Sequence, residues 1–154
     1  MPDRDLIERH ARPERIALIA QSHAALTGKA LVARCDGDVA DALWHLPAVV
    51  LAHGIEDDPV FFYANRAALD RFALTGRALM AMPSRLSAEA PERGERDRLL
   101  ARVGANGFID DYSGVRIAAT GQRFRIGRAT VWNLIDAAGH RHGQAATFAE
   151  WTDL

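Results

Sequence analysis

The sequence predicts an α+β fold: a five-stranded antiparallel sheet with helices packed on one face and a helical extension at the N-terminus. Apolar residues recur at helical spacing between Asp5 and Ala33. Two short runs rich in β-branched and aromatic residues follow, at 48–53 and 60–63, and three longer runs come after a helical insert. One antiparallel sheet accommodates two early strands, a helical insert and three late strands.

The chain has 154 residues, 49% of them apolar and 25% charged, which suits a single domain with a normal core. Within it we expect an N-terminal helical segment at residues 1–46 and the sheet domain at residues 47–154. The net charge of −1 provides no global field that favours nucleic acid or an anionic membrane, so we expect neither as a partner.

We expect a cytoplasmic protein. The first residues lack the apolar run of a signal peptide, and no stretch approaches the 18 apolar residues of a membrane span. Cys35 is the only cysteine, so neither an intramolecular disulfide nor a cage of thiolate metal ligands forms within one chain. This cysteine usage fits a reducing compartment.

The first half contains clear boundary signals. The N-terminal helical segment is interrupted at Pro13 and at Thr27-Gly28, and a turn at 36–38 precedes a short helix at 39–45. The first two strands form a hairpin. Asn65 then caps a helix at residues 66–72, because its side chain accepts a hydrogen bond from an early backbone N–H, and Thr75-Gly76 ends that helix.

The second half is predicted as one long helix followed by three strands. Residues 92–106 form a charged amphipathic helix with Leu99, Leu100 and Val103 on its buried side. Strands are expected at 109–119, 122–135 and 140–148. Glycines at Thr120-Gly121 and Ala138-Gly139 provide the positive φ of tight turns.

Five segments together closely resemble the MEKHLA domain, a family described as PAS-like: FYANRAALDRF, PSRLSAE, FIDDYSGVR, ATVWN and HGQAATF. The resemblance covers about residues 48–148 and implies the PAS fold, whose order of elements matches the prediction. It also implies a sensory or regulatory role, without an assigned ligand or reaction. The family occurs in small bacterial stand-alone proteins and at the C-terminus of class III homeodomain leucine-zipper transcription factors. No homeodomain or zipper is visible here, so we expect the stand-alone bacterial type.

The longest late strand indicates one candidate site. Alternation places Arg128 and Trp132 on the same face as Phe124 and Ile126, and we assign that face to the helix-covered side. A buried guanidinium needs a carboxylate, a carbonyl or a ligand anion. Arg128 therefore forms either an internal ion pair or a contact to an anionic ligand.

The preceding strand offers a partner for that arginine. Its apolar phase places Asp111 and Ser113 inward and Tyr112 and Arg116 outward, so that Asp111 would pair with Arg128 in the simplest structural interpretation. A β-bulge at Gly114 would reverse the assignment, because a shift of one residue changes every face.

The last strand and the helical insert provide the other candidates. If Phe148 points inward, so do Gln144 and His142. Gln144 then reads the polar edge of a ligand or satisfies backbone groups, while His142 is a ligand contact or a structural residue. Arg85 clamps a carboxylate or lies on the surface. The candidate ligand-binding residues are Arg128, Trp132, Gln144, His142, Asp111, Tyr112, Asn65 and Arg85.

Several specific chemistries are excluded or disfavoured by the sequence. Flavin photochemistry of the light-oxygen-voltage kind needs a cysteine beside the flavin, and Cys35 lies upstream of the sheet domain. A haem-ligating histidine in the insert is absent, since no histidine occurs between His53 and His140. Motifs of zinc proteases, P-loops and serine hydrolases are missing. His140 and His142 support weak surface metal binding at most, and no cofactor is identified.

The leading hypothesis is a non-enzymatic sensory domain that binds a small planar or anionic organic molecule between sheet and helices, thereby biasing a partner interface. One alternative is a homodimeric interaction module that pairs through the apolar stripe between Ile16 and Leu26. The other is a small enzyme that uses Arg128, Asp111 and His142 for acid, base and electrophilic roles.

Overall fold

The computed structural model describes residues 2–32, 38–88 and 90–154, with the backbone only at 90–93 and 96. Cys35 and the first two residues of the turn expected at 36–38 lie outside the described residues. No helix among the described residues is long and apolar enough to cross a membrane.

Three helices form the N-terminal segment: α1 (Pro2–Ala11), α2 (Pro13–Thr27) and α3 (Val39–His45). Arg12, with φ 73°, separates the first two, and Pro13 starts α2, where its missing N–H costs nothing. Gly28 ends α2 in the left-handed conformation, and Asp38 caps α3 by accepting from the Ala40 N–H at 2.9 Å. The predicted interruptions and the short third helix are confirmed.

The middle of the chain contains the first hairpin and the helical insert. Its elements are β1 (Val49–His53), β2 (Phe61–Ala64), α4 (Arg66–Phe72), α5 (Gly76–Met80), the 3₁₀ helix η1 (Ser84–Ser87) and α6 (Ala90–Asn106). Asn65 caps α4 as predicted, with its Oδ1 accepting from Ala68 N–H at 3.0 Å. The predicted end of this helix at Thr75-Gly76 is wrong: Ala73 ends α4 in the left-handed conformation, and Thr75 caps α5.

The late strands are β3 (Phe108–Ile117), β4 (Arg123–Ile135), β5 (Arg141–Phe148) and β6 (Glu150–Asp153). They extend the hairpin into one antiparallel sheet with the strand order β2-β1-β5-β4-β3. The sequence did not predict β6. It pairs with the first part of β4, from Phe124 to Gly127, while β5 pairs with the second part, from Thr130 to Ile135. β6 therefore continues the line of β5 along β4 after a break at Ala149.

Two β-bulges change the faces of β3 and β4. The pairs Ile109↔Val131 and Tyr112↔Ala129 set three steps on β3 against two on β4, and the next pair, Gly114↔Ile126, sets two steps against three. The second bulge contains Arg128, whose φ is 50°. Because side chains alternate along a strand, each extra residue inverts the faces that follow it.

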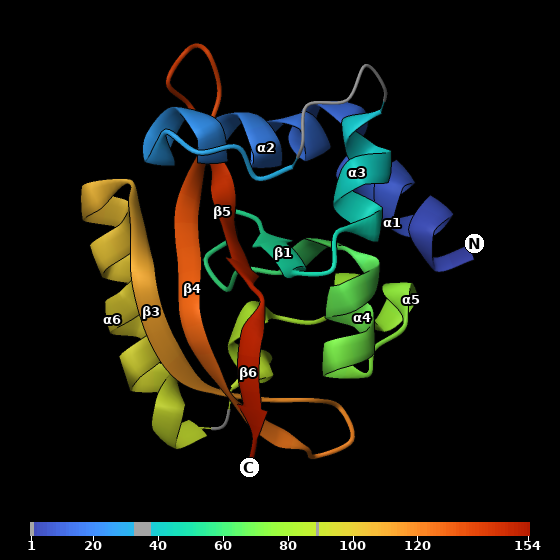
Figure 1. The fold of residues 1–154 in the computed structure, drawn as a ribbon, viewed down its shortest axis with the longest axis vertical. Helices are drawn as coiled ribbons and strands as arrows, with labels where there is room; N and C mark the ends of the chain where they lie inside the picture. The colour runs from blue at the N-terminus through green and yellow to red at the C-terminus, as the bar shows by residue number, and fades with distance from the viewer. Residues whose placement is uncertain (1, 33–37, 89) are drawn as a thin grey trace.

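The sheet has helices on both faces, as neighbouring residues of β4 show. The Trp132 indole N–H donates to the carbonyl of Ile19 in α2 at 3.2 Å, while the Asn133 amide donates to the carbonyl of Val103 in α6 at 3.1 Å. Adjacent strand residues point to opposite faces, so α2 and α6 cover opposite faces of the sheet (Figure 1). The α+β fold is confirmed, and the N-terminal extension forms the layer on the second face.

The N-terminal helices share one hydrophobic core with the sheet. Ile7, Ile19 and Trp44 are buried in the same cluster as Tyr63 and Leu134. A polar network on the surface reinforces this packing.

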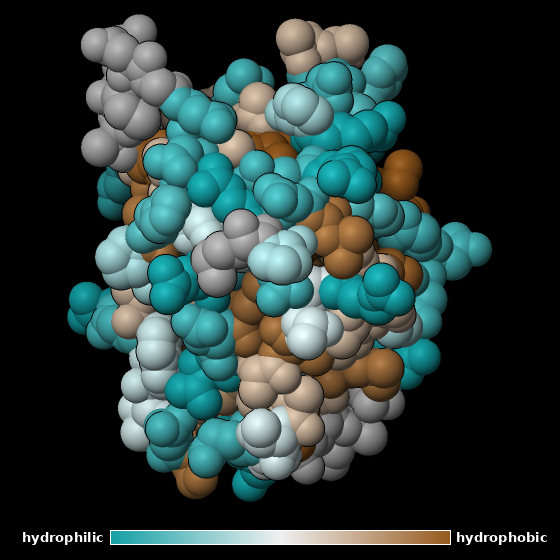
Figure 2. All heavy atoms as spheres, turned by 90° about the vertical axis from the view of Figure 1, so that its right-hand side faces the viewer, coloured by the Kyte–Doolittle hydropathy of each residue, from teal (hydrophilic) through white to brown (hydrophobic). Residues whose placement is uncertain are grey.

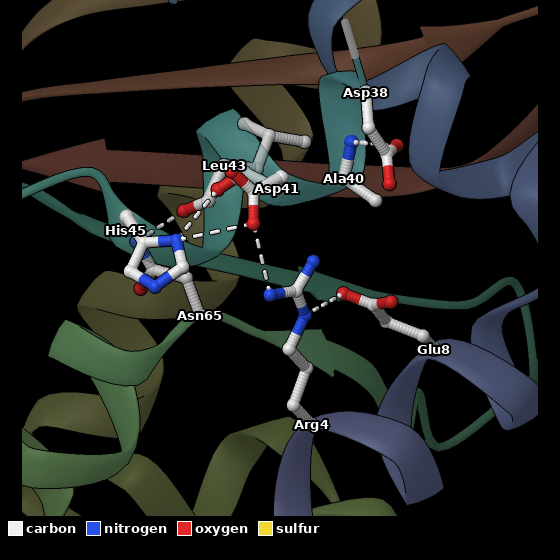
Figure 3. A network of polar contacts seen from close by, with 8 residues as sticks. All are labelled: Arg4, Glu8, Asp38, Ala40, Asp41, Leu43, His45 and Asn65. Atoms are coloured by element: carbon white, nitrogen blue, oxygen red, sulfur yellow. Dashed lines mark hydrogen bonds and ion pairs between the residues drawn. The ribbon is translucent and has the colours of Figure 1, made fainter. Parts of the chain in front are cut away.

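In that network the Arg4 guanidinium lies 2.8 Å from the Glu8 carboxylate of its own helix and 3.0 Å from Asp41 of α3 (Figure 3).

On the side where α3, α4 and α5 lie, hydrophilic groups surround a smaller hydrophobic area in the middle of the face (Figure 2).

Candidate functional site

A cavity of about 70 Å³ lies between the sheet and the helices η1, α4 and α6. Its walls are mostly apolar and include Leu51, Phe72, Leu99, Val131 and Phe148. Its polar lining residues are His53, Ser84, Ser87, Tyr112, Arg116 and Gln144. A concave, apolar space with a few polar groups is the usual form of a small-molecule site.

The size of this cavity limits what it holds in the described conformation. A cavity of about 150 Å³ binds benzene, and about 10–15 Å³ is enough for one water molecule. A volume of about 70 Å³ therefore suits several waters or an organic molecule of roughly three or four heavy atoms. A flavin or a haem needs a larger space.

Gln144 lines the cavity, and Asn133 supports it from the neighbouring strand. They are paired across β4 and β5, and both are buried. The Gln144 Nε2 donates to Asn133 Oδ1 at 3.0 Å and to the carbonyl of Leu100 in α6 at 3.3 Å. Asn133 Nδ2 donates to the Val103 carbonyl, and Arg141 Nε donates to Asn133 Oδ1 at 3.3 Å.

These partners fix the direction of both amides. A backbone carbonyl only accepts, so the carbonyls of Leu100 and Val103 each require an N–H from the side chain that faces them. Asn133 must then present its oxygen to the Gln144 NH₂ group, which leaves Gln144 Oε1 as the remaining atom. This oxygen is buried and has no hydrogen-bond partner among the described residues.

Arg116 and Tyr112, both in β3, form a second polar part of the wall. The Arg116 guanidinium carbon lies 5.3 Å from the centroid of the Tyr112 ring, and its Nη1 donates to the Val115 carbonyl at 2.9 Å. The Tyr112 ring lies directly over Gly114, where a Cβ would come within 2.7 Å of the ring carbon Cζ. Glycine at this position lets the tyrosine lie flat along the strand.

His53 and the two serines surround the same cavity. His53 Nδ1 donates to the Gly54 carbonyl at 3.0 Å, since a carbonyl accepts only. Ser87 Oγ donates to the carbonyl of Ser84 at 2.7 Å within η1. Sequence reasoning missed His53, the two serines and Arg116 as cavity residues.

The predicted inward positions of Arg128, Asp111 and Ser113 are wrong. All three side chains are exposed, and Tyr112 and Arg116 face the cavity instead. The bulges explain the difference: Arg128 sits in the bulge of β4, and Asp111 lies between the shifted pairs of β3. Gly114 is the sequence signal for this difference, because a β-bulge there reverses which residues of the strand point inward.

Trp132 and His142 also lie away from the cavity. Trp132 is buried on the opposite face, where its ring meets His23 of α2 edge to face at 4.8 Å between centroids. His142 lies near the start of β5, with its Nε2 2.8 Å from Asp136 Oδ2. This hydrogen bond holds the pKa of the Asp136 carboxyl below its usual range. His140 lies 3.7 Å from the same carboxylate.

Asn65 and Arg85 have structural roles. Besides capping α4, Asn65 accepts from Val50 N–H at 3.0 Å and donates to the carbonyl of Ala48 at 2.8 Å. These bonds connect the start of α4 to the start of β1. Asn65 also donates to the Leu43 carbonyl (Figure 3). Arg85 is exposed and pairs with Asp58 at 3.1 Å. Among the described residues, no group of three or more His, Cys, Asp or Glu could hold a metal ion.

The sheet order and the helical insert define a PAS-like fold. The sequence pattern of the MEKHLA domain matches residues 13–153, so the chain belongs to the MEKHLA domain family. This match is wider than the resemblance at residues 48–148, since it includes α2, α3 and β6.

Curated relatives with this similarity are plant proteins. Homeobox-leucine zipper protein HOX29 of Oryza sativa subsp. indica is 26% identical over 142 residues, which cover 88% of this chain and 16% of the relative. Homeobox-leucine zipper protein ATHB-9 of Arabidopsis thaliana is 26% identical over 150 residues, 91% of this chain and 18% of the relative. The chain thus spans less than a fifth of either relative.

Solved structures support the fold assignment. The PAS domain of a Colwellia psychrerythraea protein has a TM-score of 0.60 at 9% identity and covers 75% of this chain and 92% of its own. An RNA-binding light-oxygen-voltage receptor reaches 0.61 at 15% identity, over 74% of this chain and 32% of its own. The light-state dimer of the fungal photoreceptor Vivid reaches 0.59 at 14% identity, over 86% and 93%. At these identities the similarity shows the fold.

Proposed function

We propose that this MEKHLA protein is a sensory domain that binds a small organic molecule in the cavity between β4, β5 and α6. The observation that carries the proposal is Gln144 Oε1, a buried acceptor on the wall of a mostly apolar cavity, with no hydrogen-bond partner among the residues that the structure describes. Buried polar groups are nearly always hydrogen-bonded, so an exception in a cavity calls for a bound molecule or water. Arg116 adds a buried guanidinium to the same wall, which favours a ligand with polar groups.

A bound molecule would alter the position of α6. The lining residues Leu99 and Leu100 belong to this helix, and Gln144 donates to the Leu100 carbonyl. A ligand that prefers one position of α6 shifts the population towards it, and a partner that contacts α6 senses the difference.

Native mass spectrometry of the purified chain, followed by denaturing extraction and identification of small molecules, tests this function. A stoichiometric compound is the expected result. The cavity-filling variant Ala129→Val should lose it, since Ala129 lines the cavity and is 2% exposed. Ala138→Val, at the exposed β4–β5 turn, is the matched control and should retain it. Retention of the compound by both variants would refute binding in this cavity.

The two alternatives have less support. Ile16 and Ile19 of the stripe proposed for dimerisation are buried in the chain's own core, so that face of α2 is already occupied. The acid, base and electrophile proposed for an enzyme do not meet in the cavity, because Arg128 and Asp111 are exposed and His142 contacts Asp136 outside it. Assignment to the stand-alone bacterial type and to the cytoplasm remains a prediction from the sequence.

A further inference from the structure

We infer that the cavity prefers small ligands that present an O–H or N–H donor, such as an alcohol or a primary amide, over isosteric ketones. This inference rests on the proposed function and specifies its ligand class. The selecting atom is Gln144 Oε1. It provides an acceptor and no donor to the space beside it.

The direction of the Gln144 amide is the first step of the argument. Rotating the amide by half a turn would place Oε1 against the Leu100 carbonyl and Asn133 Oδ1, both of which now accept from Nε2. Two hydrogen bonds would become contacts between oxygens. Asn133 cannot rotate to compensate, since its own Nδ2 is held by the Val103 carbonyl and its Oδ1 also accepts from Arg141. The protein contacts therefore engage Nε2 and leave Oε1 as the Gln144 atom that a ligand in the cavity can bind.

The second step concerns what this oxygen accepts. An unpartnered buried acceptor is costly, and a ligand donor removes that cost. A ligand carbonyl placed there meets Oε1 oxygen to oxygen and leaves it unsatisfied. A site built around a hydrogen bond discriminates against an isostere that lacks the donor far more strongly than an apolar wall does. The cavity volume of about 70 Å³ restricts the comparison to molecules of roughly four heavy atoms.

The test is a pair of NMR titrations of the full ¹⁵N-labelled chain with 2-propanol and with acetone. The two probes share their shape and differ in the hydroxyl donor. We expect 2-propanol to shift the side-chain amide signals of Gln144 and Asn133 and to bind about tenfold or more tightly than acetone. Equal affinities would overturn the inference and leave the proposed function standing. Binding of neither probe would overturn both, since the cavity would then hold water alone.

Three variants test whether Gln144 Oε1 itself causes the difference in affinity between the two probes. Gln144→Met keeps the length of the side chain without the acceptor, and its affinity ratio should fall close to one. Gln122→Met makes the same substitution at the β3–β4 turn, outside the cavity, and should keep the wild-type ratio. Asn133→Leu removes one of the two acceptors that hold the Gln144 amide, so loss of this positioning residue should also lower the ratio. If Gln144→Met fails to fold, the wild-type ratio by itself decides the inference.

Discussion

Trp132 and Asn133 are neighbours in β4 that bind helices on opposite faces of the sheet. The Trp132 indole donates to Ile19 of α2, and the Asn133 amide donates to Val103 of α6. The two helices are thus fixed by adjacent residues of one strand. A displacement of α6 by a ligand would act on the same short segment of β4 that holds the N-terminal helices.

Replacing Asn133 should destabilise the fold through the α6 side. Asn133→Ala removes the donor to the Val103 carbonyl and the acceptor for Gln144 and Arg141, all in a buried setting. We expect a loss of about 2 kcal/mol in the free energy of unfolding, measured by urea titration. Asn106→Ala, at the exposed end of α6, is the control and should change it by less than about 0.5 kcal/mol. Similar values for the two variants would contradict the role of the Asn133 network.

Replacing Trp132 should instead weaken the α2 side. Trp132→Phe loses the hydrogen bond to Ile19 and leaves unfilled space in the core, so we expect a cost of about 2 kcal/mol. Hydrogen exchange should increase in α2 more than in α6. Trp151→Phe makes the same substitution at a residue that is 39% exposed and should cost less than about 1 kcal/mol. Uniformly faster exchange in both helices would argue against a separate attachment of α2.

The order of helices and strands was predictable because it depends on local signals. Apolar periodicity, the Asn65 cap and the turn glycines at 121 and 139, both with positive φ, lie within short segments. The faces of β3 and β4 depend on two bulges, each a shift of a single residue. Apolar residues occur on both sides of β4 because α2 and α6 cover both faces. Alternation therefore could not decide which set lines the cavity, and Arg128 was placed wrongly.

The part of the site that depends on a regular strand was predictable from the sequence. Gln144 was expected on the inner face of β5, and it lines the cavity. Arg116 was expected to point outward because its strand was read without a bulge before Tyr112. His53 and Ser84 reach the cavity from elements that lie far apart in the sequence, so only the tertiary packing brings them together. Their roles as ligand contacts are still predictions.

Gly114 should be sensitive to any side chain because Tyr112 lies over it. In Gly114→Ala the new Cβ meets the phenol ring of Tyr112, which must move into the cavity or towards Arg116. We expect a loss of about 1–3 kcal/mol in unfolding free energy. In a Tyr112→Leu background, where the ring is gone, Gly114→Ala should cost less unfolding free energy than it costs in the wild-type chain.

Gly104→Ala is the matched control for that prediction. Gly104 lies in α6, and nothing comes within 4 Å of its added Cβ. Alanine is the better helix former, so this variant should gain about 0.5–1 kcal/mol. Equal effects at positions 104 and 114 would show that the Tyr112 contact is not limiting.

Stability should fall in mild acid because of His23. Burial against Trp132 lowers the pKa of this imidazole below 6.5, and Lys29 nearby acts in the same direction, whereas the Nδ1–H bond to the Lys29 carbonyl opposes it. The unfolded chain then binds the proton more readily than the folded one. The stabilising contribution is therefore complete above pH 6.5 and is lost as the pH falls below that value through the folded pKa. Urea titrations on both sides of pH 6.5 should show this slope, and His23→Gln should reduce it. His10→Gln, at an exposed position in α1, should leave the slope unchanged. A wild-type slope in His23→Gln would assign the acid sensitivity to another group.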